Sequence, residues 1–142
     1  MSALDEARWS ELERRAFAVR RHAHAPYSRY LVGAALLTRS GEVFAGCNVE
    51  NASYGLCLCA ERSAIAQMVA AGAREPIAIA IATNGPAPGS PCGMCRQVLA
   101  EFAGDLEVRL LVEGKPDRTR QTTLGALLPD AFRADSLDAA HR

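Results

Sequence analysis

The sequence predicts a three-layer α/β/α domain built on a central mixed β-sheet. Apolar residues recur at spacings of three and four near the N-terminus, which is typical of an amphipathic helix. The run 77–82 (Ile-Ala-Ile-Ala-Ile-Ala) has no polar face, which is typical of a strand buried on both sides. Helical and strand-like segments alternate around this run, so helices should cover both faces of one sheet. The length suits a single domain over 1–142.

The first element is expected to be a helix over 5–24. Its apolar side chains recur at helical spacing and would share one face, which carries Trp9, Leu12, Ala16, Val19 and Ala23. Pro26 follows as a stop, because proline cannot continue a helix. His22 and His24 would lie at the C-terminal end of this helix, where we expect them to face solvent rather than bind a metal.

Two antiparallel strands should follow as a hairpin. Residues 31–37 and 43–48 are apolar runs, and the stretch 38–42 between them has the composition of a turn. Cys47, near the end of the second strand, is expected to be a small buried hydrophobe. Residues 51–55 are small and polar, so they predict a loop.

Two further helices should flank the central strand. The first is expected over 58–71, with Gly72 ending it. Its buried face would carry Ile65, Met68 and Val69. After the central strand, residues 84–91 are rich in glycine and proline, which excludes regular structure there. The next helix should begin near Cys92, and its inward face would carry Val98, Leu99 and Phe102.

The C-terminal part is expected to hold a strand, a short helix and a tail. Residues 108–112 are apolar and predict a strand. Residues 124–132 predict a short helix that breaks at Pro129. About 133–142 should form a mobile C-terminal tail, in which we assign no role to His141.

Charge and cysteine content narrow the class of function. Sixteen acidic and sixteen basic residues cancel, and no basic stripe is interleaved with aromatic residues, so we expect a small-molecule substrate and no nucleic acid. The charged N-terminus is unlike a signal peptide, and no apolar run approaches the roughly 18 residues of a membrane span. We therefore expect no membrane partner and a cytoplasmic location. Five cysteines in a reducing cytosol predict metal or thiol chemistry rather than disulfides.

Two motifs carry the chemistry, and each is expected to open a helix. They are CAE over 59–61 and PCGMC over 91–95. Cys92 and Cys95 are three apart on a helix, so both thiols can reach one ion, and Cys59 would supply a third ligand. Three protein ligands leave the fourth position of zinc open, as in catalytic sites. Glu61 lies close enough to Cys59 to serve as a proton carrier beside the metal.

The expected net charge of the metal site indicates that a positive group should lie near these thiols. Zinc with three thiolates carries a net charge of −1, which weakens its pull on a bound water. The N-terminal ends of the two helices offer partial positive charge and favour thiolates. Arg62 or Arg96, each adjacent in sequence to a motif residue, could also hydrogen-bond a thiolate, and we favour Arg62 for this charge tuning.

The motifs alone leave two non-catalytic interpretations open. Cys92 and Cys95 could be a thioredoxin-type redox pair, although this leaves Cys59 and Glu61 without a role. Alternatively, Cys57 could complete a four-cysteine structural zinc site. A single residue separates Cys57 from Cys59, which is less than the usual two to four.

Several ordered blocks of the sequence resemble the small, homotetrameric cytidine deaminases over nearly the whole chain. The blocks are APYS (25–28), VGAALL (32–37), GCNVENASY (46–54), CAERSAI (59–65), PCGMCRQVL (91–99) and LLPDAF (127–132). Several blocks in one order and spacing are more specific than any single block. The resemblance implies a cytidine deaminase-like α/β fold.

The resemblance also implies a zinc site with one ion per subunit. Its ligands map onto Cys59, Cys92 and Cys95, and its general acid/base maps onto Glu61. Cys57 falls outside the family pattern, which counts against the four-cysteine site.

The substrate-binding residues are implied by the same blocks. The ribose-binding pair maps onto Asn48 and Glu50, and the aromatic clamp on the pyrimidine maps onto Tyr30. A phenylalanine is common in the family where Tyr30 stands, so the extra hydroxyl bears on fine specificity. The remaining substrate-binding positions are Ala60, Tyr54 and, from a neighbouring subunit, Phe132.

The implied function is zinc-dependent hydrolytic deamination of cytidine and deoxycytidine to uridine and deoxyuridine, in pyrimidine salvage, with active sites at the subunit interfaces of a homotetramer. Glu61 would take a proton from the zinc-activated water, deliver it to N3 and move a second proton to the exocyclic amine. The alternatives are deamination of a related nucleoside such as blasticidin S, nucleic-acid editing, which the neutral composition disfavours, and a non-catalytic structural zinc module.

Overall fold

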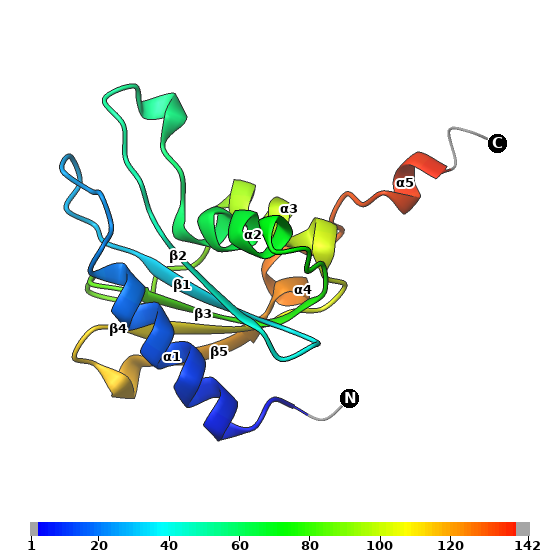
Figure 1. Cartoon of the computed structure of the whole chain (residues 1–142), viewed down its shortest axis with the longest axis horizontal. Helices are drawn as coiled ribbons and strands as arrows, with labels where there is room; N and C mark the ends of the chain where they lie inside the picture. Colours follow the sequence, from blue (N-terminus) through cyan, green and yellow to red (C-terminus); the bar gives the residue numbers. More distant parts are fainter. Residues whose placement is uncertain (1–2, 139–142) are drawn as a thin grey trace.

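Five strands form one mixed sheet in the order β2-β1-β3-β4-β5. We describe residues 3–138 of a computed structural model (Figure 1). The strands are β1 (Gly33–Thr38), β2 (Val43–Cys47), β3 (Pro76–Thr83), β4 (Glu107–Val112) and β5 (Arg120–Thr123). The β3–β4 pair is parallel and the other neighbours are antiparallel, so the predicted mixed sheet and the β1–β2 hairpin are confirmed. The predicted central strand is β3.

Helices cover both faces of this sheet, as predicted. They are α1 (Glu6–Arg20), α2 (Ala60–Ala70), α3 (Gly93–Phe102), α4 (Leu124–Leu127) and α5 (Asp135–Asp138). Helix α1 packs on one face, while α2 and α3 lie on the opposite face (Figure 1). Within residues 3–138, every helix is too short or too polar to span a lipid bilayer.

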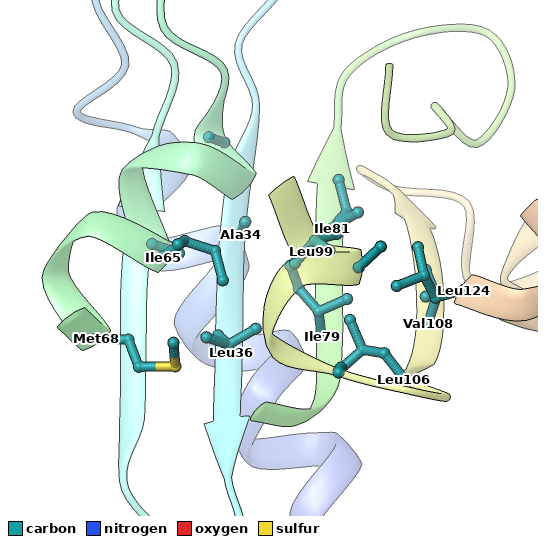
Figure 2. Close-up of a cluster of buried hydrophobic side chains, with 14 of the residues drawn as sticks. Ala34, Leu36, Ile65, Met68, Ile79, Ile81, Leu99, Leu106, Val108 and Leu124 are labelled. Carbon is teal, nitrogen blue, oxygen red and sulfur yellow. The ribbon is translucent and has the colours of Figure 1, made fainter. Parts of the chain in front are cut away.

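Each face of the sheet contributes to its own apolar cluster. Under α2 and α3, alternate residues of the central strands, such as Leu36 and Ile79, point toward the helices. They pack against helix side chains that include Ile65, Met68 and Leu99 (Figure 2). The intervening residues point to the other face, because side chains alternate along a strand. There they pack against α1 through Trp9, Leu12 and Ala16.

Helix α1 ends at Arg20, four residues before the predicted end at His24. The chain leaves the helix because His24 pairs with the strand-like segment after β2. Its backbone N–H donates to the Asn48 carbonyl at 3.0 Å, and its carbonyl accepts from the Glu50 N–H at 2.7 Å. His22 and His24 are both exposed to solvent, as expected.

Helix α2 begins at Ala60 rather than at the predicted residue 58. Leu58 exchanges two backbone hydrogen bonds of 2.9 Å with Val49, so it belongs to an extended bridge. Gly72 follows the helix with a φ of +87°, a left-handed conformation that glycine adopts without steric cost, so the predicted stop is confirmed. Val69, expected to be buried, is half-buried.

The C-terminal part departs most from the sequence prediction. Strand β5 was not predicted, because Arg120–Thr123 is a polar edge strand without apolar alternation. Helix α4 ends at Leu127, well before the predicted residue 132. Leu128 precedes Pro129 and is non-helical, since a residue before proline is disfavoured in the helical region. Of the predicted tail, 133–138 includes α5, and 139–142 with His141 lies outside the described residues.

Two predicted loops differ in detail. Residues 84–91 contain no helix or strand, as predicted. The predicted loop 51–55 runs into a 3₁₀ turn at Tyr54–Leu56. This loop extends away from the sheet beyond β2, on the same side as the connection between α1 and β1 (Figure 1).

Candidate active site

Three thiols meet where α2 and α3 begin. Cys59 is the N-cap of α2 and Cys92 is the N-cap of α3, so both lie at positively polarised helix ends. Cys95 lies in the first turn of α3 and is buried. The Cys59 and Cys92 sulfurs are 3.8 Å apart, and the Cys92 and Cys95 sulfurs are 3.5 Å apart. All three sulfurs lie within 4.8 Å of one another.

This spacing fits a tetrahedral zinc ion. Zinc–sulfur bonds of about 2.3 Å at tetrahedral angles place two sulfurs about 3.8 Å apart. The three thiols therefore need little rearrangement to bind one ion, and they leave its fourth position free for another ligand. Among the described residues, these cysteines are the group of metal-binding side chains that comes together in this way.

Cys57 and Cys47 lie outside the thiol cluster. The Cys57 sulfur instead accepts from the backbone N–H of Asn51 at 3.4 Å. The four-cysteine structural site therefore lacks its fourth ligand. Cys47 is half-buried at the end of β2, and burial raises the pKa of its thiol.

Glu61 places a carboxylate beside the thiols. Its side chain is 5% exposed, and Oε2 lies 3.7 Å from the sulfur of Cys95. Burial raises the pKa of this carboxyl, because a low-dielectric environment disfavours the charged form. A carboxyl of this kind can hold a proton closer to neutral pH than an exposed glutamate, as a general acid/base requires.

Hydrogen bonds among the thiols and from Arg62 shift the pKa values of the thiols. A hydrogen bond from Cys95, followed by those from Arg62 and Cys92, lowers the pKa of Cys59 to about 5. The same bond to Cys59 raises the pKa of Cys95, with burial adding to it. The Arg62 guanidinium lies 3.6 Å from the Cys59 sulfur and donates to the Cys57 carbonyl at 3.3 Å.

Arg96, the other candidate for charge tuning, is directed elsewhere. Its guanidinium donates to the Pro91 carbonyl at 2.8 Å and to the Leu127 carbonyl at 2.7 Å. It therefore fastens the start of α3 to α4, whereas Arg62 contacts a thiol.

A cavity of about 250 Å³ opens in front of the thiols and Glu61. Four of the predicted substrate-binding residues line it, namely Tyr30, Asn48, Glu50 and Ala60. Cys59, Cys92 and Glu61 belong to the same lining, so the reactive groups and the predicted sugar and base contacts share one space. Small clefts with a few convergent polar groups are the usual binding sites for small molecules.

Asn48 and Glu50 already make hydrogen bonds to the cleft wall. The Asn48 amide accepts from the Val32 N–H and donates to the Tyr30 carbonyl, both at 2.8 Å. The Glu50 carboxylate accepts from the backbone of Tyr27 and from the hydroxyl and backbone of Ser28. These bonds, led by the Ser28 hydroxyl, lower the pKa of Glu50, so its carboxylate stays ionised.

The two remaining predicted contacts lie away from the cavity. Tyr54 is 74% exposed, and Phe132 is 58% exposed. The Tyr54 ring packs edge-on against Tyr27, with 5.9 Å between ring centres. The Phe132 carbonyl accepts from Gln97 of α3 at 2.8 Å. Within one chain, neither residue joins the lining of the cleft.

The sequence prediction missed the contribution of residues 84–91 and of the end of β3. Thr83, Gly89 and Ser90 line the cavity, and Asn84 bonds to the wall that carries Tyr30. This stretch was predicted only as irregular structure. One signal was available, because the segment links the end of a central strand to the motif cysteines, and such loops often form binding sites.

Comparisons with known proteins agree with this geometry. Residues 7–109 match the family model described as the cytidine and deoxycytidylate deaminase zinc-binding region. A cytidine deaminase of Mycobacterium tuberculosis is 43% identical over 134 residues, covering 94% of this chain and 96% of that protein. One of Halalkalibacterium halodurans is 41% identical over 127 residues, covering 89% of this chain and 96% of that protein.

A solved structure shows the same similarity to cytidine deaminases. The crystal structure of cytidine deaminase from Burkholderia pseudomallei superposes with a TM-score of 0.81 at 52% identity, covering 87% of this chain and 98% of that one. The matched segment of the family model contains all three clustered cysteines and Glu61. The chain therefore belongs to the cytidine and deoxycytidylate deaminase family that shares this zinc-binding region.

Proposed function

We propose that this chain catalyses the hydrolytic deamination of cytidine and deoxycytidine to uridine and deoxyuridine, as a step of pyrimidine salvage. The observation that carries the proposal is a buried carboxylate, Glu61, which lies 3.7 Å from Cys95 of the three-thiol cluster and lines a cavity of about 250 Å³ together with Cys59 and Cys92. Relatives that span nearly the whole chain and are named cytidine deaminases support it.

The metal would be held by Cys59, Cys92 and Cys95, with one zinc ion per subunit. Zinc bound to these thiolates would supply the Lewis acidity that makes a water molecule nucleophilic near neutral pH. Arg62 lies close enough to Cys59 to offset part of the thiolate charge. This placement supports its proposed role in charge tuning.

Glu61 performs the proton transfers in this proposal. Its buried carboxyl takes a proton from the attacking water and gives it to N3 of the pyrimidine, which makes C4 electrophilic. The water oxygen adds to C4, and Glu61 then moves the second proton of that oxygen to the exocyclic amine, so that the C4–N bond breaks and ammonia leaves. The contact with Cys95 would put the carboxyl beside a metal ion held by the thiols, which supports the assignment of both transfers to this side chain.

Tyr30, Asn48, Glu50 and Ala60 would bind the nucleoside, since all four line the cavity. Asn48 has a second amide hydrogen, and Glu50 has further acceptor lone pairs, for the sugar hydroxyls. Tyr54 and Phe132 are exposed beyond this cavity, so we place them at the substrate site of a neighbouring subunit in a homotetramer.

The exposed apolar side chains support such an assembly. In the described part of the chain they include Tyr27, Val49, Tyr54, Leu56, Met94 and Phe132. A second copy would remove this apolar surface from water. A cytoplasmic location is supported by the five cysteines, none of which forms a disulfide within the described residues.

The proposal is tested by measuring zinc content and activity on the same preparation. We expect one zinc ion per subunit and an ultraviolet absorbance change with cytidine and deoxycytidine but not with free cytosine. Turnover of blasticidin S alone would assign the related nucleoside activity. Zinc binding without deamination of any of these compounds would contradict the proposal and favour a structural metal site.

A further inference from the structure

The cleft wall that carries Tyr30 is held mainly by side chains rather than by a β-ladder. Over residues 27–32, every backbone N–H donates a hydrogen bond, although the segment is neither helix nor strand. Five of these six bonds end on side-chain oxygens, which belong to Glu50, Ser28, Asn84 and Asn48. Backbone polar groups without such partners would be free to reorient. The conformation of this wall therefore depends on a few polar side chains.

Asn84 holds the two peptide groups on either side of Tyr30. Its Oδ1 accepts from the Leu31 N–H at 3.1 Å, and its Nδ2 donates to the Arg29 carbonyl at 3.3 Å. Arg29 adopts a φ of +56°, a left-handed conformation that is uncommon for a residue with a side chain. The amide of Asn84 stabilises this conformation, because it pairs with groups that only this backbone path brings together.

The Tyr30 ring packs on the same loop that carries Asn84. A Cβ added at Gly85 would lie 3.2 Å from the ring, and one added at Gly89 would overlap the Tyr30 hydroxyl. The ring therefore packs directly on glycine backbone. This loop continues into Cys92, so one segment contacts both the aromatic wall and the thiol cluster.

We propose that Asn84 is a positioning residue that fixes the Tyr30 ring for nucleoside binding. The inference rests on the proposed function, since it assigns Asn84 to the substrate cleft of that activity. Asn84 acts through the backbone of Arg29 and Leu31, and the reaction steps belong to other residues. Its loss should weaken nucleoside binding and leave the zinc site and the chemical step intact.

The test compares kcat and KM for cytidine in wild type and Asn84→Ala. We expect KM to rise about tenfold, in keeping with the loss of one or two hydrogen bonds that order the wall. The value of kcat should stay within about twofold, because Glu61 and the thiols are untouched. Zinc content should be unchanged. An unchanged KM, or a fall in kcat that follows a loss of zinc, would overturn the inference.

Gln67→Ala is the matched control. Gln67 also donates from a side-chain amide to a backbone carbonyl, that of Ala45, but it joins α2 to β2 away from the cleft. It should lower the melting temperature to a similar extent without changing KM. Equal rises of KM in both variants would mean that general loosening, rather than the position of Tyr30, causes the effect.

Two further variants locate the effect at Tyr30. Asn84→Asp keeps the acceptor for Leu31 but places a carboxylate against the Arg29 carbonyl, so its KM should also rise. In a Tyr30→Ala background, Asn84→Ala should cause no further rise. A full additional rise there would overturn the inference.

Failure of the proposed function would be visible in the wild type. A wild-type protein that neither binds nor deaminates a pyrimidine nucleoside would overturn both proposals. An active wild type with an unchanged Asn84→Ala KM would overturn only the role of Asn84.

Discussion

At the scale of single residues, the proposed chemistry depends on Glu61 and Cys95. Their contact of 3.7 Å joins the buried carboxyl that we propose as the proton carrier to a buried thiol that we propose as a metal ligand, while Cys59 and Cys92 are the N-cap residues of α2 and α3. N-caps usually carry a side chain that accepts from the helix backbone. Neither cysteine makes such a bond, so both thiols remain available for a metal.

Replacing Glu61 with glutamine should separate metal binding from turnover. The amide keeps the shape of the side chain but cannot take up and release a proton, so kcat should fall by about 10²-fold to 10⁴-fold. Zinc content should remain at the wild-type level. Glu101→Gln, an exposed change on α3, is the control and should leave both quantities unchanged. A Glu61→Gln enzyme with near-wild-type kcat would refute the assignment.

Gly89 and Tyr30 should behave as a coupled pair. An alanine at 89 would overlap the Tyr30 hydroxyl and place its Cβ 3.0 Å from the Thr83 methyl group. Gly89→Ala should therefore raise KM for cytidine by about tenfold, because the ring must move. Tyr30→Phe removes the overlapping atom, so the double variant should recover most of this loss. Additive effects in a double-mutant cycle would show that the two residues are independent.

At the scale of elements, close backbone contacts bring the helices onto the sheet. Gly33 of β1 lies against α1, and Gly46 of β2 lies against α2. Because neither residue has a Cβ, the helix backbone can approach the strand directly. The second contact also places the start of α2, with Cys59 and Glu61, next to the strand that leads to Asn48.

Gly46→Ala should destabilise the fold strongly. An ideal Cβ there would overlap the Ala64 backbone nitrogen and lie 2.8 Å from the Ser63 carbonyl carbon. Backbone atoms cannot move aside cheaply, so the free energy of unfolding should fall by about 3 kcal/mol or more. Gly104→Ala has open space around its Cβ and is the control. Denaturant melts that coincide for the two variants would contradict this account.

Arg109 ties α1 to the sheet and gives stability an acid dependence. Its guanidinium lies 4.3 Å from the centre of the Trp9 ring and pairs with Glu6 and Glu13 of α1. The hydrogen bond from Arg109 lowers the pKa of Glu6 below its unfolded value of about 4.3. This contribution is therefore present above that pH and is lost as the pH falls through the folded pKa.

Arg109→Gln should lower the free energy of unfolding at pH 7 by about 1–2 kcal/mol, through lost cation–π contact and packing. The part of the difference that comes from the Glu6 ion pair should be lost as the pH falls below about 4, because Glu6 then becomes protonated, whereas the cation–π and packing part should remain. Arg39→Gln is the control, because Arg39 and Glu75 form an exposed pair. A pH-independent difference in thermal melts would show that the Arg109–Glu6 ion pair contributes nothing to it.

At the scale of the whole molecule, one chain brings only Tyr30 of the three aromatic residues that we assign to substrate binding into the cavity. Tyr30 lines the cavity, whereas Tyr54 and Phe132 extend into solvent on other parts of the surface. Exposed apolar side chains that gather in a patch often mark a protein–protein interface. The proposed homotetramer gives these rings a place at the cleft of a neighbouring subunit.

Mixed oligomers should test this arrangement. A Glu61→Gln subunit cannot turn over substrate but still donates Phe132, whereas a Phe132→Ala subunit keeps its own thiols and Glu61. Refolding the two together should give more activity than either alone, up to about a quarter of wild type if each site draws on one neighbour. Activity equal to the average of the two parents would mean that Phe132 acts within its own chain or not at all.

Local sequence patterns were sufficient to predict the layers of the fold and the group of metal-binding side chains. The alternation of apolar helices and strands predicted the three-layer fold, and the spacing of Cys59, Cys92 and Cys95 predicted a shared metal site. These features depend on periodicity and on residue chemistry within short segments, which a single sequence displays directly. The family resemblance added the predicted sugar and ring contacts, of which Tyr30, Asn48 and Glu50 line the same cavity.

Contacts between segments far apart in the sequence decided the ends of the elements, the edge strand β5 and the hydrogen bonds around the cleft. The end of α1 depends on the pairing of His24 with the segment after β2, and β5 exists because β4 offers it an edge. The hydrogen bonds of Asn84 to the wall around Tyr30 join residues more than fifty positions apart in the sequence. The sequence by itself determined which elements form and which side chains can bind a metal, because these follow from local patterns. Only the tertiary structure decided where elements end and which polar groups shape the cleft, because backbone hydrogen bonds find their partners only after the chain has packed.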